Sequence, residues 1–365
     1  MELPVVEVRR YLQPLSWLYG IGINFRNWLF DRKILKQKKF DIPVICVGNI
    51  TVGGTGKTPH IEYLISLLSP RYKVAVLSRG YKRKSRGFQI VEVNSKVRDA
   101  GDEPLQIKKK FPSVLVVVDK NRVNAIEKML TFDEDKRPDV VLLDDGYQHR
   151  SVQPSLSILL VDSNRPVYED KLLPSGFLRE PLKGKNRASI VLVTKCHPDL
   201  QPIDFRIYSN GLDLFPFQSL YFTTLDYEEI KPVFPELNDE QLELNNLLKK
   251  HVFLVTGVAS PEPLVRKLEL KTYNLYTKFF PDHHNFTKRD IDSIIEMIDE
   301  VNEENKVILT TEKDAVRFRS LNYLSEEIKK KMYYIPVKVT FLNSQEKFSF
   351  NKKIVEHVRN NKTNS

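Results

Sequence analysis

The stretch Ile45-Cys46-Val47-Gly48-Asn49-Ile50-Thr51-Val52-Gly53-Gly54-Thr55-Gly56-Lys57-Thr58 decides the fold of this chain. An apolar strand runs into a glycine-rich loop, a Lys-Thr pair follows, and a helical pattern of apolar residues begins directly afterwards. Backbone N–H groups of such a loop can surround an anion, while the lysine reaches the β- and γ-phosphates and the threonine hydroxyl binds Mg²⁺. The stretch therefore predicts a nucleotide-phosphate site.

The match to the common phosphate-loop motif is incomplete, because Thr51 stands where the first glycine is expected. A glycine-rich turn between a strand and a helix, without a ligand, is the alternative that the stretch leaves open. If the loop binds a nucleotide, its cofactor-binding residues are Gly53, Gly54, Thr55, Gly56, Lys57 and Thr58.

Composition sets broad limits on the function. The 365 residues suffice for two domains with separate cores. A net charge of +10 and a pI near 9.2 indicate an anionic partner, and nucleic acid, an acidic lipid surface and a phosphorylated substrate all fit. Cys46 and Cys196 lie in separate apolar runs, which predicts two buried thiols in a reducing compartment. We expect no secretory signal and no membrane-spanning helix, since residues 1–10 are mixed in charge and no long apolar run occurs.

Residues 11–40 are unusual because they contain both tryptophans of the chain, Trp17 and Trp28, among many aliphatic residues. A basic cluster follows directly, from Arg32 to Lys39. Aromatic rings at headgroup depth beside cations are typical of an interfacial membrane element. A helix packed on its own domain, with a solvated basic end, explains the same residues equally well.

Apolar strand-like runs alternate with helical patterns along most of the chain, which predicts a mostly parallel, doubly wound α/β sheet. Prolines and a β-rich run at residues 219–224 interrupt the alternation, which restarts at residue 251. We therefore expect an N-terminal element at residues 1–40, a phosphate-loop core at 41–215 and a ribbon-like linker at 216–250. A smaller α/β lobe at 251–350 and a flexible basic tail at 351–365 complete this division.

Two aspartates, Asp144 and Asp145, end the strand predicted at residues 138–143. An apolar strand that ends in aspartate is the arrangement that holds Mg²⁺ opposite a phosphate-loop threonine. His149 follows closely and could be a core residue, a base or a metal ligand, and its position alone does not decide.

Other polar residues near strand ends have two interpretations each. Asp102 and Glu103 precede a helical pattern, where helix capping is the common explanation. Arg122 follows a strand and could hold a phosphate. The motif at residues 311–314 fits a helix cap and also a loop that binds a nucleobase.

Several motifs follow one another along the chain. They are Val47-Gly48-Asn49, Gly53-Gly54-Thr55-Gly56-Lys57-Thr58-Pro59, Leu77-Ser78-Arg79-Gly80-Tyr81, Gly101-Asp102-Glu103-Pro104, Asp144-Asp145-Gly146-Tyr147-Gln148-His149, Leu173-Pro174-Ser175-Gly176, Leu178-Arg179-Glu180-Pro181, Asp282-His283 and Thr311-Glu312-Lys313-Asp314-Ala315. In this order they closely resemble the tetraacyldisaccharide 4'-kinase family, the lipid A 4'-kinases of Gram-negative bacteria. Thr51 is no anomaly in this comparison, because the family is similar there.

The resemblance implies transfer of the ATP γ-phosphate to the 4'-hydroxyl of a tetraacylated glucosamine disaccharide 1-phosphate. It implies ATP and Mg²⁺ as cofactors and the lipid A disaccharide precursor as partner. It also implies a peripheral protein on the cytoplasmic face of the bacterial inner membrane, where the N-terminal element meets an anionic lipid surface.

Residue roles follow from the matched motifs. The implied catalytic residues are Asp102 as general base, His283 as its partner, Lys57 and Arg179. Arg122 and Arg79 would neutralise phosphate charge. The residues implied around the metal are Thr58, Asp144, Asp145, Gln148, His149 and Glu180.

A phosphate-loop ATPase that binds nucleic acid or a protein partner is the alternative function. It would use the same net charge of +10. The chain lacks an RNA-binding aromatic signature, and both tryptophans lie beside the first basic cluster, so we expect no nucleic-acid partner.

Overall fold

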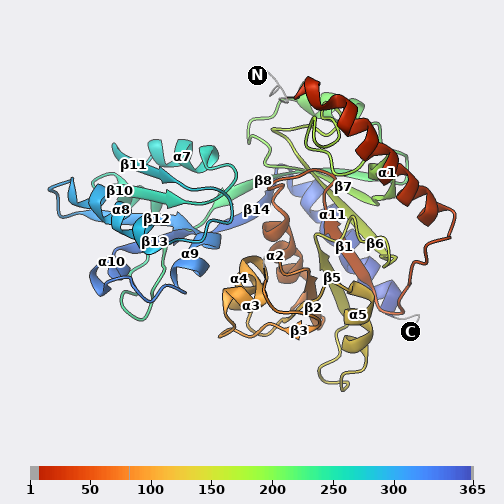
Figure 1. The fold of residues 1–365 in the computed structure, drawn as a ribbon, viewed down its shortest axis with the longest axis horizontal. Coiled ribbons are helices and arrows are strands. Elements are labelled where there is room, and N and C mark those ends of the chain that lie inside the picture. Colours follow the sequence, from red (N-terminus) through yellow and green to blue (C-terminus); the bar gives the residue numbers. More distant parts are fainter. Residues whose placement is uncertain (1–7, 82, 363–365) are drawn as a thin grey trace. The chain divides into compact units, whose positions relative to one another are not determined.

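The computed structural model describes residues 8–81 and 83–362. The chain forms two compact units (Figure 1). Unit 1 contains residues 1–93, 107–225 and 339–365, and unit 2 contains residues 94–106 and 226–338. This division is discontinuous in sequence, whereas the ranges expected from the sequence were contiguous. Residues 1–7 of the expected N-terminal element lie outside the described residues.

Unit 1 is built on a nine-stranded sheet with the order β14-β8-β7-β6-β1-β5-β2-β4-β3. The neighbouring pairs from β8 to β4 are parallel, and β3 pairs antiparallel with β4. The strands are β1 (Val44–Gly48), β2 (Val74–Ser78), β3 (Gln89–Ile90), β4 (Leu115–Val118), β5 (Val140–Asp144), β6 (Leu156–Asp162), β7 (Ile190–Thr194), β8 (Ser219–Tyr227) and β14 (Val337–Phe341).

The mostly parallel sheet confirms the predicted fold class. All residues of β1, β2, β5, β6 and β7 are buried, as expected for parallel strands covered on both faces. The helices that accompany this sheet are η1 (Arg10–Leu12), α1 (Gln13–Asp31), α2 (Lys57–Leu68), α5 (Arg122–Leu130), η2 (Leu182–Arg187), α6 (Pro202–Leu212) and α11 (Ser344–Lys362).

The C-terminal residues correct one expectation. Residues 351–362 were expected to be part of a flexible basic tail, but they belong to α11. Phe350, Ile354 and Val358 are fully buried at the spacing of one helix face. The amide oxygen of Asn351 also accepts a 2.8 Å hydrogen bond from the Tyr63 hydroxyl on α2. The tail prediction was wrong because three apolar residues at helical spacing suffice to pack a polar segment; residues 363–365 lie outside the described residues.

Unit 2 has a smaller sheet of its own, with the order β11-β10-β12-β13-β9. Its strands are β9 (Lys231–Pro232), β10 (His251–Thr256), β11 (Asn274–Phe279), β12 (Lys306–Thr311) and β13 (Met332–Ile335). Its helices are α3 (Val97–Ala100), η3 (Leu244–Leu247), α7 (Glu262–Glu269), α8 (Lys288–Asp299), α9 (Glu312–Phe318) and α10 (Glu326–Lys330). Helix α4 (Asp102–Lys110) begins in unit 2 and ends in unit 1.

The topology of unit 1 determines where polar residues meet. β1 lies between β5 and β6, so chain segments that leave the carboxyl ends of these strands emerge side by side. Val47 pairs with Asp144, which brings the glycine-rich loop next to the aspartates after β5. Ligands of open α/β sheets bind at this kind of position.

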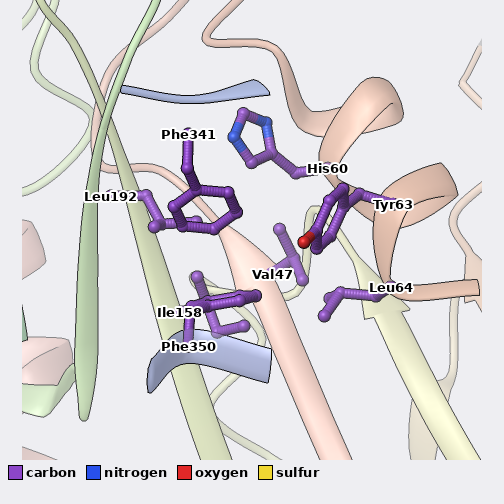
Figure 2. A pocket seen from close by; sticks show the side chains of 8 residues that line it. All are labelled: Val47, His60, Tyr63, Leu64, Ile158, Leu192, Phe341 and Phe350. Carbon is purple, nitrogen blue, oxygen red and sulfur yellow. The ribbon is translucent and has the colours of Figure 1, made fainter. Parts of the chain in front are cut away.

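A small apolar pocket lies inside unit 1, between α2, the sheet and α11 (Figure 2). Its volume is about 10 Å³, room for one water molecule at most. It is therefore a packing defect of the core and not a nucleotide site. The side chains around it are Val47, His60, Tyr63, Leu64, Ile158, Leu192, Phe341 and Phe350.

Candidate functional site

The phosphate loop is held in shape by contacts inside unit 1. Gly53 and Gly56 have φ angles of 105° and 81°, a left-handed conformation that favours glycine. Thr55 is fully buried; its hydroxyl accepts a 3.0 Å hydrogen bond from the Asn49 amide, and its carbonyl accepts a 2.9 Å bond from the Thr194 hydroxyl. The loop therefore needs little rearrangement to receive an anion.

His60 fixes the loop from the side of α2. Its Nδ1 lies 2.7 Å from the Gly56 carbonyl oxygen and its Nε2 lies 3.1 Å from the Thr223 hydroxyl. A carbonyl only accepts, so Nδ1 carries the proton. Burial lowers the pKa of His60 to about 4, which keeps the ring neutral, and the Thr223 hydroxyl then donates to Nε2. Figure 2 shows this imidazole at the end of the apolar pocket.

Asp145 lies among cations at the end of β5. One carboxylate oxygen is 3.6 Å from Lys57 Nζ and the other is 3.2 Å from Arg179 Nη1. Burial alone would raise the pKa of Asp145, but the charges of Lys57 and Arg179 outweigh burial and lower it. Asp145 also has a φ of 48°, an unusual conformation for a residue with a side chain, and such conformations cluster at functional sites.

Asp144 and Arg122 are both almost fully buried beside this group. Burial lowers the pKa of Arg122 to about 10, and the charges of Asp144 and Asp145 oppose that effect. The pKa of His149 falls to about 4, first because of burial and then because of Arg122 and Arg79. His149 is therefore neutral near pH 7.

Gln148 and Glu180 form a supporting network. Gln148 Nε2 donates to the Asn49 carbonyl at 2.6 Å and to Glu180 Oε1 at 3.0 Å. Glu180 Oε2 lies 2.8 Å from Arg187, whose guanidinium also stacks over the Tyr147 ring. Both carboxylate oxygens of Glu180 thus have partners within the protein.

The residues of unit 1 fit a magnesium ion bound together with a nucleotide. Mg²⁺ takes one or two protein carboxylates and completes its shell with phosphates and water. Asp144 and Asp145 are close to the loop that presents Thr58, and the low pKa of Asp145 keeps a negative ligand available. Within residues 8–81 and 83–362 no three acidic, histidine or cysteine side chains gather into a complete metal cage.

Sequence reasoning missed two polar contacts near the loop. The Arg165 guanidinium donates to the Val52 carbonyl and lies over the Phe177 ring at 4.6 Å. Lys195 and Asp162 form a 2.7 Å ion pair at the ends of β7 and β6. The available signal was the position of these residues at the ends of β6, which neighbours β1, and of β7, which neighbours β6.

A second polar cluster lies within unit 2, around Asp102 at the start of α4. Its Oδ2 lies 2.9 Å from Nδ1 of His283, and Arg317 Nη2 also donates to Oδ2. Burial alone would raise the pKa of Asp102, but the His283 hydrogen bond and the charges of Arg317 and Lys313 lower it well below its usual range. Asp102 is therefore ionised at all ordinary pH values.

The tautomer of His283 follows from its neighbours. Lys313 Nζ lies 3.0 Å from Nε2, and an ammonium group only donates, so Nε2 accepts. The proton is therefore on Nδ1, which donates to Asp102. The adjacent His284 instead contacts Asp290 at 2.9 Å, so His283 is the histidine that the fold brings to Asp102.

The motif at residues 311–314 forms a helix cap. The Thr311 hydroxyl accepts from the Asp314 amide at 3.2 Å at the start of α9. Asp314 is fully buried, and its oxygens accept from Thr256, Gly257, Thr311 and Arg317. These bonds occupy the carboxylate that a nucleobase would need, which favours the cap interpretation.

The predicted site residues thus form two groups in different units. Asp102 and His283 belong to unit 2. The group in unit 1 consists of Gly53, Gly54, Thr55, Gly56, Lys57, Thr58, Arg79, Arg122, Asp144, Asp145, Gln148, His149, Arg179 and Glu180.

Helix α1, drawn in red in Figure 1, forms hydrogen bonds with two residues of the unit 1 group. The Tyr19 hydroxyl donates to the Arg179 carbonyl at 2.8 Å, and Arg26 donates to the Gln148 carbonyl at 2.9 Å. No helix among the described residues has the length and apolar character needed to cross a bilayer. Helix α1 and the residues on either side of it expose large apolar side chains, namely Tyr11, Leu15, Trp17, Leu18, Ile21, Phe25, Trp28, Ile34 and Leu35.

Comparisons with known proteins agree with each other. The family model described as tetraacyldisaccharide-1-P 4'-kinase matches residues 8–358. A tetraacyldisaccharide 4'-kinase of Bacteroides thetaiotaomicron is 47% identical over 371 residues, covering 100% of this chain and 97% of the relative. One of Porphyromonas gingivalis is 44% identical over 351 residues, covering 95% and 96%. A solved structure of LpxK from Aquifex aeolicus in complex with ATP has a TM-score of 0.72 at 32% identity, covering 96% of this chain and 99% of that one.

Proposed function

This chain belongs to the tetraacyldisaccharide-1-P 4'-kinase family, and we propose that it transfers the γ-phosphate of ATP to the 4'-hydroxyl of a tetraacylated glucosamine disaccharide 1-phosphate. It is a phosphotransferase of lipid A biosynthesis that uses ATP. The observation that carries this function is the family match over residues 8–358, which includes both the phosphate loop and the Asp102–His283 pair.

Unit 1 binds the phosphate donor in this proposal. Phosphoryl transfer depends mainly on in-line placement and charge neutralisation, because its transition state is loose. Backbone N–H groups of the glycine loop and Lys57 bind the β- and γ-phosphates, and Arg179 balances the charge on the transferred group. Thr58, Asp144 and Asp145 would hold Mg²⁺, which supplies further positive charge between the phosphates.

Unit 2 supplies the proton acceptor. The 4'-oxygen of the sugar forms a bond to the γ-phosphorus while the bond from that phosphorus to the bridging oxygen of ADP breaks. The hydroxyl proton passes to the Asp102 carboxylate and from there to solvent. Nδ1–H of His283 orients Asp102 for this step, since its other nitrogen accepts from Lys313.

The chain acts at the surface of a membrane, because a tetraacylated substrate remains in the lipid phase. The exposed side chains of α1 would enter the headgroup region, and the basic residues that follow would meet anionic lipid. The contacts of Tyr19 and Arg26 connect this helix to the backbone of Arg179 and Gln148. We place the protein on the cytoplasmic face of the inner membrane, where ATP is available.

The direct test is a phosphorylation assay in detergent. The protein, ATP, Mg²⁺ and the tetraacyl disaccharide 1-phosphate should yield a glycolipid heavier by one phosphate, and a 4'-deoxy analogue should yield none. Absence of product from folded, ATP-binding protein would contradict the proposal. ATPase activity stimulated by DNA or RNA, without glycolipid phosphorylation, would favour the nucleic-acid alternative instead.

A further inference from the structure

Arg317, on α9, is a buried cation for which the proposed reaction has no role so far. Its side chain is 6% exposed, so its guanidinium must be balanced by partners within the protein. Nη2 donates to Oδ2 of Asp102 and lies 3.3 Å from Nδ1 of His283. Nη1 donates to Oδ1 of Asp314 at 2.6 Å. The guanidinium therefore connects the proposed proton acceptor to a second buried carboxylate.

Asp314 is fixed from the opposite side. Its Oδ2 accepts from the Thr256 hydroxyl at 2.9 Å, the Gly257 amide at 2.9 Å and the Thr311 hydroxyl at 2.8 Å. Thr256 ends β10 and Gly257 follows it directly; β10 lies between β11 and β12 in the unit 2 sheet. A continuous set of hydrogen bonds thus runs from this sheet through Asp314 and Arg317 to Asp102.

We propose that Arg317 is a positioning residue for phosphoryl transfer, which fixes the Asp102 carboxylate in the orientation that accepts the sugar hydroxyl proton, and that the 311–314 motif anchors Arg317. This inference rests on the proposed role of Asp102. It also gives the 311–314 motif a function other than binding a nucleobase.

The contacts of Asp102 show why orientation depends on Arg317. His283 and Arg317 both donate to Oδ2, whereas Oδ1 accepts the Glu103 amide at 3.0 Å. A carboxylate oxygen has room for about two donors, so Oδ1 retains capacity for a hydroxyl. Oδ1 is therefore the oxygen that receives the proton, and Arg317 keeps the carboxylate plane from rotating.

Strong pairing makes Asp102 a weak base, and this suits the reaction. Burial alone would raise its pKa, but the His283 hydrogen bond and the charges of Arg317 and Lys313 lower it; Lys313 also pairs with Glu103. In a loose transition state the acceptor hydroxyl loses its proton late, so a fixed acceptor contributes more than a strong one. Free rotation of the carboxylate would lose that advantage.

The test compares Arg317→Gln, which removes the charge, with Arg317→Lys, which restores it. Arg317→Gln should lower kcat about 10²-fold while the KM values for ATP and glycolipid change less than about twofold, and Arg317→Lys should recover most of the loss. The matched control is Arg289→Gln, an exposed arginine of the same unit, which should behave like the wild type. In an Asp102→Asn background, Arg317→Gln should have almost no further effect.

Two readouts separate positioning from folding. The acidic limb of the kcat profile should move up by about one pH unit in Arg317→Gln, because loss of the guanidinium raises the pKa of Asp102. If Arg317→Gln does not fold, the titration of Asp102 is measured in His283→Ala by NMR of ¹³C-labelled carboxylates. The Asp102 signal is assigned by comparison with Asp102→Asn. Because Arg317 still pairs with it, Asp102 should stay ionised down to pH 4.

Each contrary result has a distinct meaning. Wild-type kcat in folded Arg317→Gln, additive losses with Asp102→Asn, or titration of Asp102 near its ordinary pKa in His283→Ala would overturn the positioning role. Absence of glycolipid phosphorylation by the wild type would overturn the proposed function instead.

Discussion

Asp102 and Asp145 use the same physical device in different units. Asp102 is buried and Asp145 is partly buried, and in each case paired cations outweigh the burial and lower the pKa. The cations beside Asp145 are Lys57 and Arg179, which the proposal also assigns to phosphates. The cations beside Asp102 pair mainly with other groups of the protein. This arrangement suits a proton acceptor better than a metal ligand.

Replacement of Asp102 by Asn should separate chemistry from binding. The amide keeps the size of the side chain but cannot take the sugar proton, so kcat should fall by about 10²- to 10⁴-fold. The KM for ATP should change little, because the phosphate loop lies in unit 1. Steady-state kinetics in detergent measure both constants, and unchanged turnover would return Asp102 to a helix-capping role.

Replacement of Lys57 by Ala should impair binding and chemistry together. Lys57 contacts Asp145 and is proposed to reach the β- and γ-phosphates, which carry charge in the ground state and in the transition state. ATP affinity by calorimetry and kcat should both fall about tenfold or more. Lys136→Ala, at an exposed lysine of unit 1, is the control, and a loss confined to kcat would contradict the assignment.

His60 should make the free energy of unfolding decrease at acidic pH. Its folded pKa is about 4, below the ordinary 6.5, so the unfolded chain binds the extra proton between these values. The free energy of unfolding therefore falls as pH drops from 6.5 to about 4, by about 3 kcal/mol from this residue. Urea unfolding of His60→Gln should show a flatter pH dependence, while His197→Gln, at an exposed histidine, should follow the wild type; equal slopes for all three proteins would refute the argument.

Site residues differ in how well the sequence predicts them. The glycine loop and Asp144-Asp145 follow from local patterns, since each lies directly after an apolar run. Arg317 does not, because its partners Asp102 and Asp314 are recognisable as partners only once the chain has folded. The ion pair of Glu180 with Arg187 also went unpredicted, and it leaves the predicted metal role of Glu180 as a hypothesis to be tested.

At the scale of elements, α1 has two faces of different character. One face contacts the backbone of Arg179 and Gln148, and Ser16 accepts a 2.9 Å hydrogen bond from the Ser175 amide. The other face exposes a stripe of aromatic and aliphatic side chains, including Trp17, which is 66% exposed. The two sequence interpretations, a membrane element and a packed helix, are therefore compatible with each other.

A triple substitution, Trp17→Ser, Leu18→Ser and Phe25→Ser, should weaken vesicle binding. These side chains are at least 60% exposed and would insert into the interface, so their loss should reduce binding to anionic vesicles more than about tenfold. Flotation with phosphatidylglycerol vesicles measures this. Tyr273→Ser, at an 86% exposed residue of unit 2, is the control, and wild-type flotation of the triple variant would exclude the membrane role of α1.

Elements were predictable where periodicity is strong. The run that became β5 was expected at residues 138–143, within two residues of its observed ends. α11 was missed because its sequence is rich in Lys and Asn, and only its spacing of Phe350, Ile354 and Val358 indicates a packed face.

At the scale of the whole molecule, ATP should stabilise the two units unequally. If the phosphates bind to unit 1 alone, ATP with Mg²⁺ at 100 times its dissociation constant adds about 2.7 kcal/mol to the stability of that unit. Calorimetry of a chain with two cores should resolve two transitions, with only the unit 1 transition moving to higher temperature. The control uses AMP, which lacks the β- and γ-phosphates, and an equal shift of both transitions would argue against a donor site confined to unit 1.

The discontinuous units could not be read from the sequence. Residues 94–106 carry Asp102, yet their contacts are with residues 226–338, far along the chain. Likewise β14 and α11 return to the sheet of unit 1. Composition and periodicity report on neighbouring residues, whereas these assignments depend on partners more than 100 positions away.

This return of the C-terminal segment to unit 1 has a consequence for biosynthesis. The ribosome delivers β14 and α11 after all of unit 2, so the first core of the chain stays incomplete until these two elements have been made. Asp102 likewise emerges well before Arg317, at synthesis rates of about 5–20 residues per second. A premature stop codon just after residue 318 would yield a product with every proposed catalytic residue but without the helix that closes its first core, a target for quality-control proteases rather than a kinase.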